Sequence, residues 1–159
     1  MTKLRPPMNL KTEYTVNPLG VDVPQPRLFW QLHDSRRGTK QSAYQIRAGS
    51  QPGGDDLWDT GKITSPDCIH ISYQGPTLES AQRVYWQVRT WDAQDIATPY
   101  SEPAWFERGL LEDSNWQGQW ITSRQQERPI PGPAIYLRKS FDLPAKIRSA
   151  RLYITARGV

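Results

Sequence analysis

The sequence is poor in the residues that make cross-links and metal sites. Cys68 is the only cysteine among the 159 residues, so no disulfide can form within the chain. The two histidines, His33 and His70, are far apart and lack the spaced partners that a zinc site needs. We therefore expect no metal ion and no other cofactor.

Long apolar runs and clusters of one charge are also missing. No run of about 18 apolar residues occurs, and the N-terminal residues contain no apolar segment of signal-peptide length. This predicts a cytoplasmic protein with no membrane partner, although a secreted protein whose leader has been removed would look the same. The net charge is +4, but the basic residues are scattered apart from Arg36 and Arg37, so no nucleic-acid surface is predicted.

Aromatic and turn-forming residues are abundant instead. Seven Trp, seven Tyr and three Phe supply most of the potential core, since each ring can bury on the order of 150–250 Å². Fourteen Pro and eleven Gly interrupt the chain at short intervals, and no stretch has a sustained helical period. An all-β protein is therefore expected.

Residues 83–92 carry the strongest strand pattern. Val84, Trp86 and Val88 alternate with polar or aromatic residues, which predicts one buried and one outward face. Shorter strands are expected around it, at residues 10–16, 27–32, 42–48, 57–63, 68–73 and 105–108. Seven short strands in about 100 residues are typical of an immunoglobulin-like or fibronectin type III β-sandwich.

The character of the chain changes after residue 109. Residues 110–133 read as a linker with a docked aromatic segment, and 134–159 contain two further strand patterns. Two strands cannot close a core of their own. We expect 1–109 to be the sandwich and 134–159 to open a second, incomplete β domain; the alternative is that its strands join the first domain.

Several stretches together resemble the N-terminal region of bacterial α-L-rhamnosidases, the inverting glycoside hydrolases of family 78. These stretches are residues 17–22, 26–30, 41–46, 57–62, 84–88, 101–106, 116–121, 137–141 and 150–155. The resemblance implies a fibronectin type III-like domain, then a jelly-roll-like β domain, with the catalytic domain further downstream in the same polypeptide. The parent enzyme would hydrolyse terminal α-L-rhamnose from glycosides, and no position of this chain matches its catalytic residues.

Five tryptophans are the candidate functional residues. Trp30 and Trp86 lie on the predicted inward faces, whereas the others could bind carbohydrate or pack against a neighbouring domain. These candidates are Trp58, Trp91, Trp105, Trp116 and Trp120. Packing at a domain interface is the expected role, because exposed apolar patches most often mark interfaces.

The remaining reactive residues have simpler interpretations. The acidic pairs Asp55–Asp56 and Glu112–Asp113 lie in turn-like polar stretches and are expected to be solvated. Cys68 is expected to be a small buried apolar residue.

The sequence thus predicts a non-catalytic N-terminal part of an α-L-rhamnosidase with an architectural or substrate-access role. A free-standing module that binds carbohydrate or protein is the alternative. Rhamnose-containing glycosides are possible partners, and unpaired strand edges could make the chain a homo-oligomer.

Overall fold

The computed structural model describes residues 4–122, 136–143, 146–147 and 150–156. The chain divides into two compact units, Met1–Gln117 and Gly118–Val159. Within the described residues, no helix has the length and apolar character that crossing a membrane requires.

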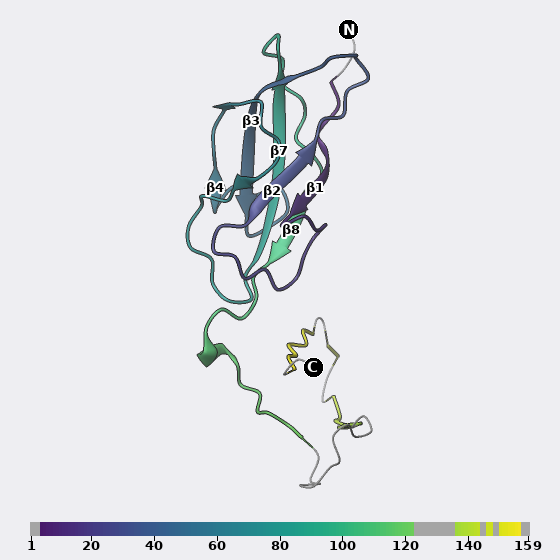
Figure 1. The fold of residues 1–159 in the computed structure, drawn as a ribbon, viewed down its shortest axis with the longest axis vertical. Coiled ribbons are helices and arrows are strands. Elements are labelled where there is room, and N and C mark those ends of the chain that lie inside the picture. Colours follow the sequence, from purple (N-terminus) through teal and green to yellow (C-terminus); the bar gives the residue numbers. More distant parts are fainter. Residues whose placement is uncertain (1–3, 123–135, 144–145, 148–149, 157–159) are drawn as a thin grey trace, which may run out of the picture. The chain divides into compact units, whose positions relative to one another are not determined.

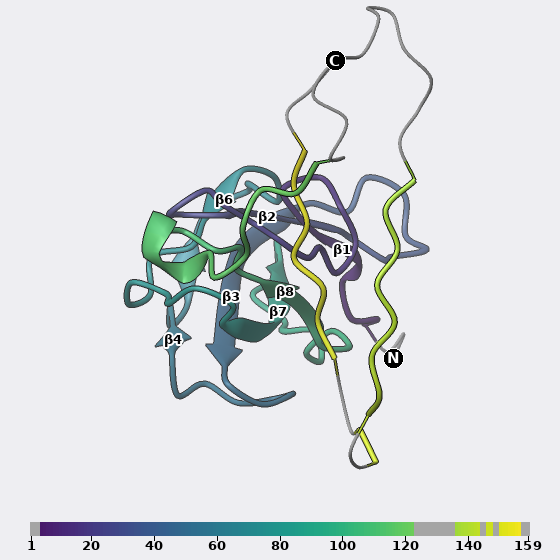
Figure 2. The ribbon, with the colours of Figure 1, turned by 90° about the horizontal axis from the view of Figure 1, so that it is seen from below.

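The first unit is a sandwich of two antiparallel sheets (Figures 1 and 2). One sheet has the order β1-β2-β6, and the other has the order β4-β3-β7-β8, with β5 also paired to β3. The strands are β1 (Met8–Thr12), β2 (Arg27–Gln31), β3 (Gln41–Gly49), β4 (Trp58–Asp59), β5 (Ile63–Thr64), β6 (Ile71–Ser72), β7 (Arg83–Asp92) and β8 (Ala104–Glu107). The predicted all-β sandwich is confirmed.

β7 is the central strand that the sequence predicts. It pairs with β3 over most of its length, from Asp92 opposite Gln41 to Tyr85 opposite Gly49. Its other edge pairs with the shorter β8. Val84, Trp86 and Val88 are almost completely buried, so the alternating pattern identifies the inward face correctly.

Two tryptophans tie the sheets together across the core. Trp30 of the three-stranded sheet donates its indole N–H to Gln41 Oε1 of the other sheet at 3.0 Å. Trp86 of the five-stranded sheet donates in the opposite direction, to Thr12 Oγ1 at 3.2 Å. Because a buried indole N–H without an acceptor is costly, these bonds help fix how the two sheets face each other.

Left-handed backbone conformations move two strand limits from their predicted positions. β1 ends at Thr12 rather than residue 16, because Glu13 and Tyr14 have φ values of 48° and 67° and form a tight turn. His70, with φ 58°, likewise breaks the alternation expected over 68–73. As a result Ile69 is exposed whereas Tyr73 is buried, although the sequence pattern places them on one face.

The predicted strand at 57–63 is interrupted too. It forms two separate two-residue strands, β4 and β5, which both pair with β3. After β8, a short 3₁₀ helix, η1 (Asp113–Asn115), lies within the first unit. The predicted domain limits at residues 109 and 133 stay predictions, since residues 123–133 lie outside the described part.

The second unit covers the two strands predicted within residues 134–159, and these stay predictions. Its described residues, 118–122, 136–143, 146–147 and 150–156, are assigned to no strand. Large apolar side chains there are exposed, with Leu152 and Ile154 both at 80%. Residues 134–135 and 149, where the two predicted strands begin, lie outside the described residues. A strand needs a partner for its backbone N–H and C=O groups, and none of the described residues of this unit has one in a ladder.

Candidate functional site

The five candidate tryptophans lie in different environments. Trp58 on β4 packs edge-to-face against the buried Tyr73, with ring centroids 5.1 Å apart. It is half-buried and contacts the hydrophobic core. Its ring therefore serves the interior of the sandwich.

Trp91 and Trp105 belong to the outward face of the five-stranded sheet, where cations cover them. Lys62 Nζ lies 5.0 Å and Arg89 Cζ 4.8 Å from the Trp91 ring centroid. Trp91 is only 9% exposed, so the sequence predicts its direction correctly but not its burial. Arg83 lies 4.1 Å from the Trp105 centroid. Cation–π contacts of this kind occupy the ring faces that a sugar would need.

Trp116 and Trp120 are the candidates with substantial exposure, at 41% and 68%. Trp116 closes the first unit just after η1, and Trp120 belongs to the second unit. Among the five candidates, these two are the ones classed as exposed.

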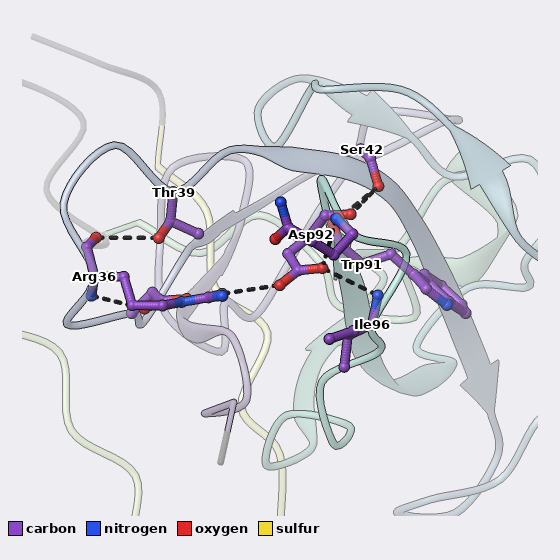
Figure 3. Close-up of polar contacts among 8 residues, drawn as sticks. Arg36, Thr39, Ser42, Trp91, Asp92 and Ile96 are labelled. Atoms are coloured by element: carbon purple, nitrogen blue, oxygen red, sulfur yellow. Dashed lines mark hydrogen bonds and ion pairs between the residues drawn. The ribbon is translucent and has the colours of Figure 1, made fainter. Parts of the chain in front are cut away.

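A polar cluster that the sequence analysis did not identify lies where β7 ends (Figure 3). The Asp92 carboxylate is nearly buried, and its Oδ1 accepts the backbone N–H groups of Gln94 and Ile96, each at 3.0 Å. The Ser42 hydroxyl donates to the Asp92 carbonyl at 2.6 Å. Such carboxylate-to-backbone bonds two residues onward are characteristic of Asx turns, so the sequence 92–95 (DAQD) after a strand is the signal that could have revealed this cluster.

Arg36 joins this turn to the loop between β2 and β3. Its Nη2 contacts Asp34 Oδ2 at 2.7 Å and Asp92 Oδ2 at 2.9 Å. The guanidinium of Arg36 lowers the pKa of Asp34 to about 2. The backbone N–H of Ile96, followed by Arg36, lowers the pKa of Asp92.

This carboxylate pair is unsuited to acid–base hydrolysis of a glycoside. An inverting glycosidase needs one carboxyl group that stays protonated to donate to the leaving oxygen. Here the pKa of both carboxyl groups is lowered, that of Asp34 by Arg36 and that of Asp92 by the Ile96 N–H and then Arg36, so both stay ionised. The cluster acts as a latch between two loops, and we call Arg36, Asp34 and Asp92 the loop latch.

A surface hollow of about 450 Å³ adjoins the latch. Its lining includes Arg5, whose Nη1 lies 3.0 Å from His33 Nε2, together with Pro6 and Pro99. Because β7 and β8 are antiparallel, the hollow and the latch lie at the opposite end of this hairpin from the point where the chain continues beyond β8.

The other reactive residues have structural surroundings. Asp56 Oδ1 accepts the Ser50 N–H and closes a turn, and hydrogen bonds from the Ser50 side chain and then its backbone lower the pKa of Asp56. Cys68 is half-buried against the core, and burial raises the pKa of its thiol. The thiol is therefore protonated at neutral pH and a poor nucleophile. In the described part of the chain, no three His, Cys, Asp or Glu side chains converge as a metal site.

Comparison with known proteins places these features in a family. Residues 7–112 match the N-terminal immunoglobulin domain of Rha78A-like proteins. An α-L-rhamnosidase from Alteromonas sp. (strain LOR) is 39% identical over 165 residues, covering 96% of this chain but only 18% of its own length.

Solved structures agree with this match. The α-L-rhamnosidase structure from Dictyoglumus thermophilum has a TM-score of 0.71 and 39% identity, covering 76% of this chain and 14% of that protein. The Streptomyces avermitilis α-L-rhamnosidase, complexed with L-rhamnose, also has a TM-score of 0.71, with 38% identity over 79% of this chain and 12% of its own. The chain thus spans less than a fifth of the length of these relatives, and it belongs to the family of Rha78A-like N-terminal immunoglobulin domains.

Proposed function

We propose that this chain is the non-catalytic N-terminal part of an α-L-rhamnosidase and that its role is architectural. The observation that carries the proposal is the state of two carboxylates that meet at one cation: Asp34 and the nearly buried Asp92 share the Arg36 guanidinium and hold loops together. The relatives are several times longer, which leaves room for a catalytic domain elsewhere in the polypeptide. That downstream domain is the proposed partner.

Activity measurements test the proposal directly. The pure 159-residue chain should release no L-rhamnose from an aryl α-L-rhamnoside, whereas a protein extended with the sequence that follows in the gene should do so. Deleting residues 1–117 from the extended protein should lower its thermal stability, because the interdomain contacts of the sandwich are lost. Turnover by the 159-residue chain itself would contradict the proposal.

A carbohydrate-binding role is the second candidate, and the exposure of Trp116 and Trp120 favours it. Calorimetric titration of the chain with a rhamnose-containing glycoside separates the two functions. A binding module should release heat with the wild type and lose it on Trp116→Ala or Trp120→Ala, whereas Trp58→Ala is the control for a ring committed to the core. A purely architectural domain should show no heat in any of these titrations.

Cytoplasmic location and self-association are further parts of the proposal. The apolar side chains exposed in the second unit, such as Leu152 and Ile154, support association through this part of the chain. Light scattering at increasing concentration should show a rising molar mass. A constant monomer mass would contradict self-association.

A further inference from the structure

The segment that leaves the sandwich after β8 is bonded to it in two successive places. In the first place, the backbone just after β8 is hydrogen-bonded to residues 81–82 on one side and to Val21 on the other. Arg108 N–H donates to the Gln82 carbonyl at 2.9 Å, and Gly109 N–H donates to the Val21 carbonyl at 3.0 Å. The Gly109 carbonyl then accepts the Ala81 N–H at 3.2 Å.

The buried Arg108 side chain adds further hydrogen bonds at this first place. It is 3% exposed, and its guanidinium donates to the backbone carbonyls of Val23 and, at 3.5 Å, Asp22. Burial lowers the pKa of Arg108. These two bonds join residues 22–23 to the end of β8, although the buried Arg108 Nε–H has no hydrogen-bond partner.

The second place is centred on the hydroxyl of Ser80. This half-buried oxygen accepts the Leu111 N–H at 3.0 Å and donates its own proton to Asn115 Oδ1. Asn115 Oδ1 also accepts the Glu112 N–H at 3.2 Å. One serine on the turn before β7 therefore connects both ends of the 111–115 turn to the sandwich. We call Ser80, Leu111 and Asn115 the exit staple.

We infer that residues 109–116 are a rigid continuation of the sandwich, and that Ser80 and Asn115 are positioning residues that set the direction in which the polypeptide leaves this domain. The inference rests on the proposed function for its biological meaning, since only a downstream domain needs to be oriented. Residues 110–116 fall in the predicted linker 110–133, whose limits stay a prediction, and within it Leu111 and Asn115 are hydrogen-bonded to Ser80 of the sandwich.

Amide hydrogen exchange on the 159-residue chain tests the staple itself. Ser80→Ala should speed exchange at the Leu111 amide by about tenfold or more, because its acceptor is lost. Asn115→Ala should do the same at the Glu112 amide. Ser114→Ala is the matched control, since Ser114 is exposed within the same turn, and it should leave both rates unchanged. The Val88 amide in β7 reports global unfolding and should be unaffected in all three variants.

Unchanged Leu111 exchange in Ser80→Ala, or an equal rise in Ser114→Ala, would overturn the inference. A second readout uses the extended protein, where Ser80→Ala should broaden the interdomain distances measured by small-angle scattering while Ser114→Ala should not. The exchange experiment does not depend on activity. An extended protein that fails to hydrolyse rhamnosides would therefore contradict the proposed function without contradicting the exit staple. If Ser80→Ala speeds Leu111 exchange as expected but the scattering of an active extended Ser80→Ala protein matches the wild type, only the positioning role is contradicted.

Discussion

Two stretches of this chain have nearly the same alternating pattern but differ in structure. In β7, Val84, Trp86 and Val88 are at most 1% exposed, whereas Leu152 and Ile154 in the second unit are each 80% exposed. β7 has β3 on one edge and β8 on the other. The described residues 150–156 are assigned to no strand and take part in no strand pairing. An alternating pattern therefore predicts which face a strand would bury, but pairing decides whether the strand forms.

Where β8 no longer pairs with β7, side chains accept hydrogen bonds from the backbone N–H groups of β7. β8 pairs only with the first part of β7, from Arg83 to Trp86. Beyond it, Ser101 Oγ accepts the Val88 N–H at 3.1 Å, and Thr98 Oγ1 accepts the Thr90 N–H at 3.0 Å. The sandwich thus satisfies backbone groups that β8 is too short to reach.

The largest expected effect distinguishes a core tryptophan from an exposed one. Trp86→Ala should lower the free energy of unfolding by about 3–5 kcal/mol, because it leaves a large cavity and removes the bond to Thr12. Trp120→Ala, 68% exposed, should change it by less than about 0.5 kcal/mol. Urea denaturation followed by circular dichroism measures both. Similar losses for the two variants would show that the second unit is packed as tightly as the sandwich.

A smaller loss is expected from a hydroxyl that completes the β7 edge. Ser101→Ala should cost about 1–2 kcal/mol, since the buried Val88 N–H loses its side-chain acceptor. Thr155→Ala in the second unit is the control and should be neutral within about 0.5 kcal/mol. The same denaturation curves serve here, and a neutral Ser101→Ala would mean that the edge bonds contribute nothing.

Acid should weaken the sandwich through the loop latch. The folded pKa of Asp92 lies below its ordinary value, so its contribution is present above the unfolded pKa of about 3.9 and is lost as pH falls towards the folded pKa. Asp34, with a folded pKa of about 2, acts in the same direction. Thermal unfolding between pH 6 and pH 2 should therefore show falling stability below about pH 4, and less steeply in Asp92→Asn. Asp142→Asn, in the second unit, is the matched control. If the stability of Asp92→Asn falls with pH as steeply as that of the wild type, the loop latch does not cause the loss of stability in acid.

The smallest effect concerns strain, which the sandwich imposes at several turns. Ala81 has φ 60°, a left-handed conformation that costs an alanine about 1–2 kcal/mol. Ala81→Gly should therefore stabilise the protein by about 0.5 kcal/mol, the strain relief exceeding the entropy cost of glycine. Ala93→Gly is the control and should destabilise slightly. Calorimetric melting temperatures measure both, and destabilisation by Ala81→Gly would show that the turn is not strained.

The alternation of apolar and polar residues allowed most of the sandwich strands to be predicted. The strand limits that it placed wrongly share one cause. The limits of β7 were correct because ten residues alternate without interruption. The predicted strand ends at residue 16 and around His70 were misplaced, because nothing in a sequence of ordinary residues announces φ values of 48° to 67°. Glycine or asparagine would have signalled such turns, but tyrosine and histidine do not.

The candidate site was harder to predict than the fold. The outward direction of Trp91 followed from alternation, yet its ring is covered by Arg89 of β7 and by Lys62, which precedes β5. The loop latch and the exit staple join residues 56 and 35 positions apart in the chain, Arg36 with Asp92 and Ser80 with Asn115. No local motif encodes such pairs.

By itself, the sequence determined the fold class, the inward face of the central strand and the family resemblance, because these depend on period-two alternation and on the order of short segments. Only the tertiary structure decided which tryptophans are covered, which carboxylates are ion-paired, and how far after β8 the chain stays hydrogen-bonded to the sandwich. The physical reason is that burial, ion pairing and hydrogen bonding depend on side chains brought together from distant positions.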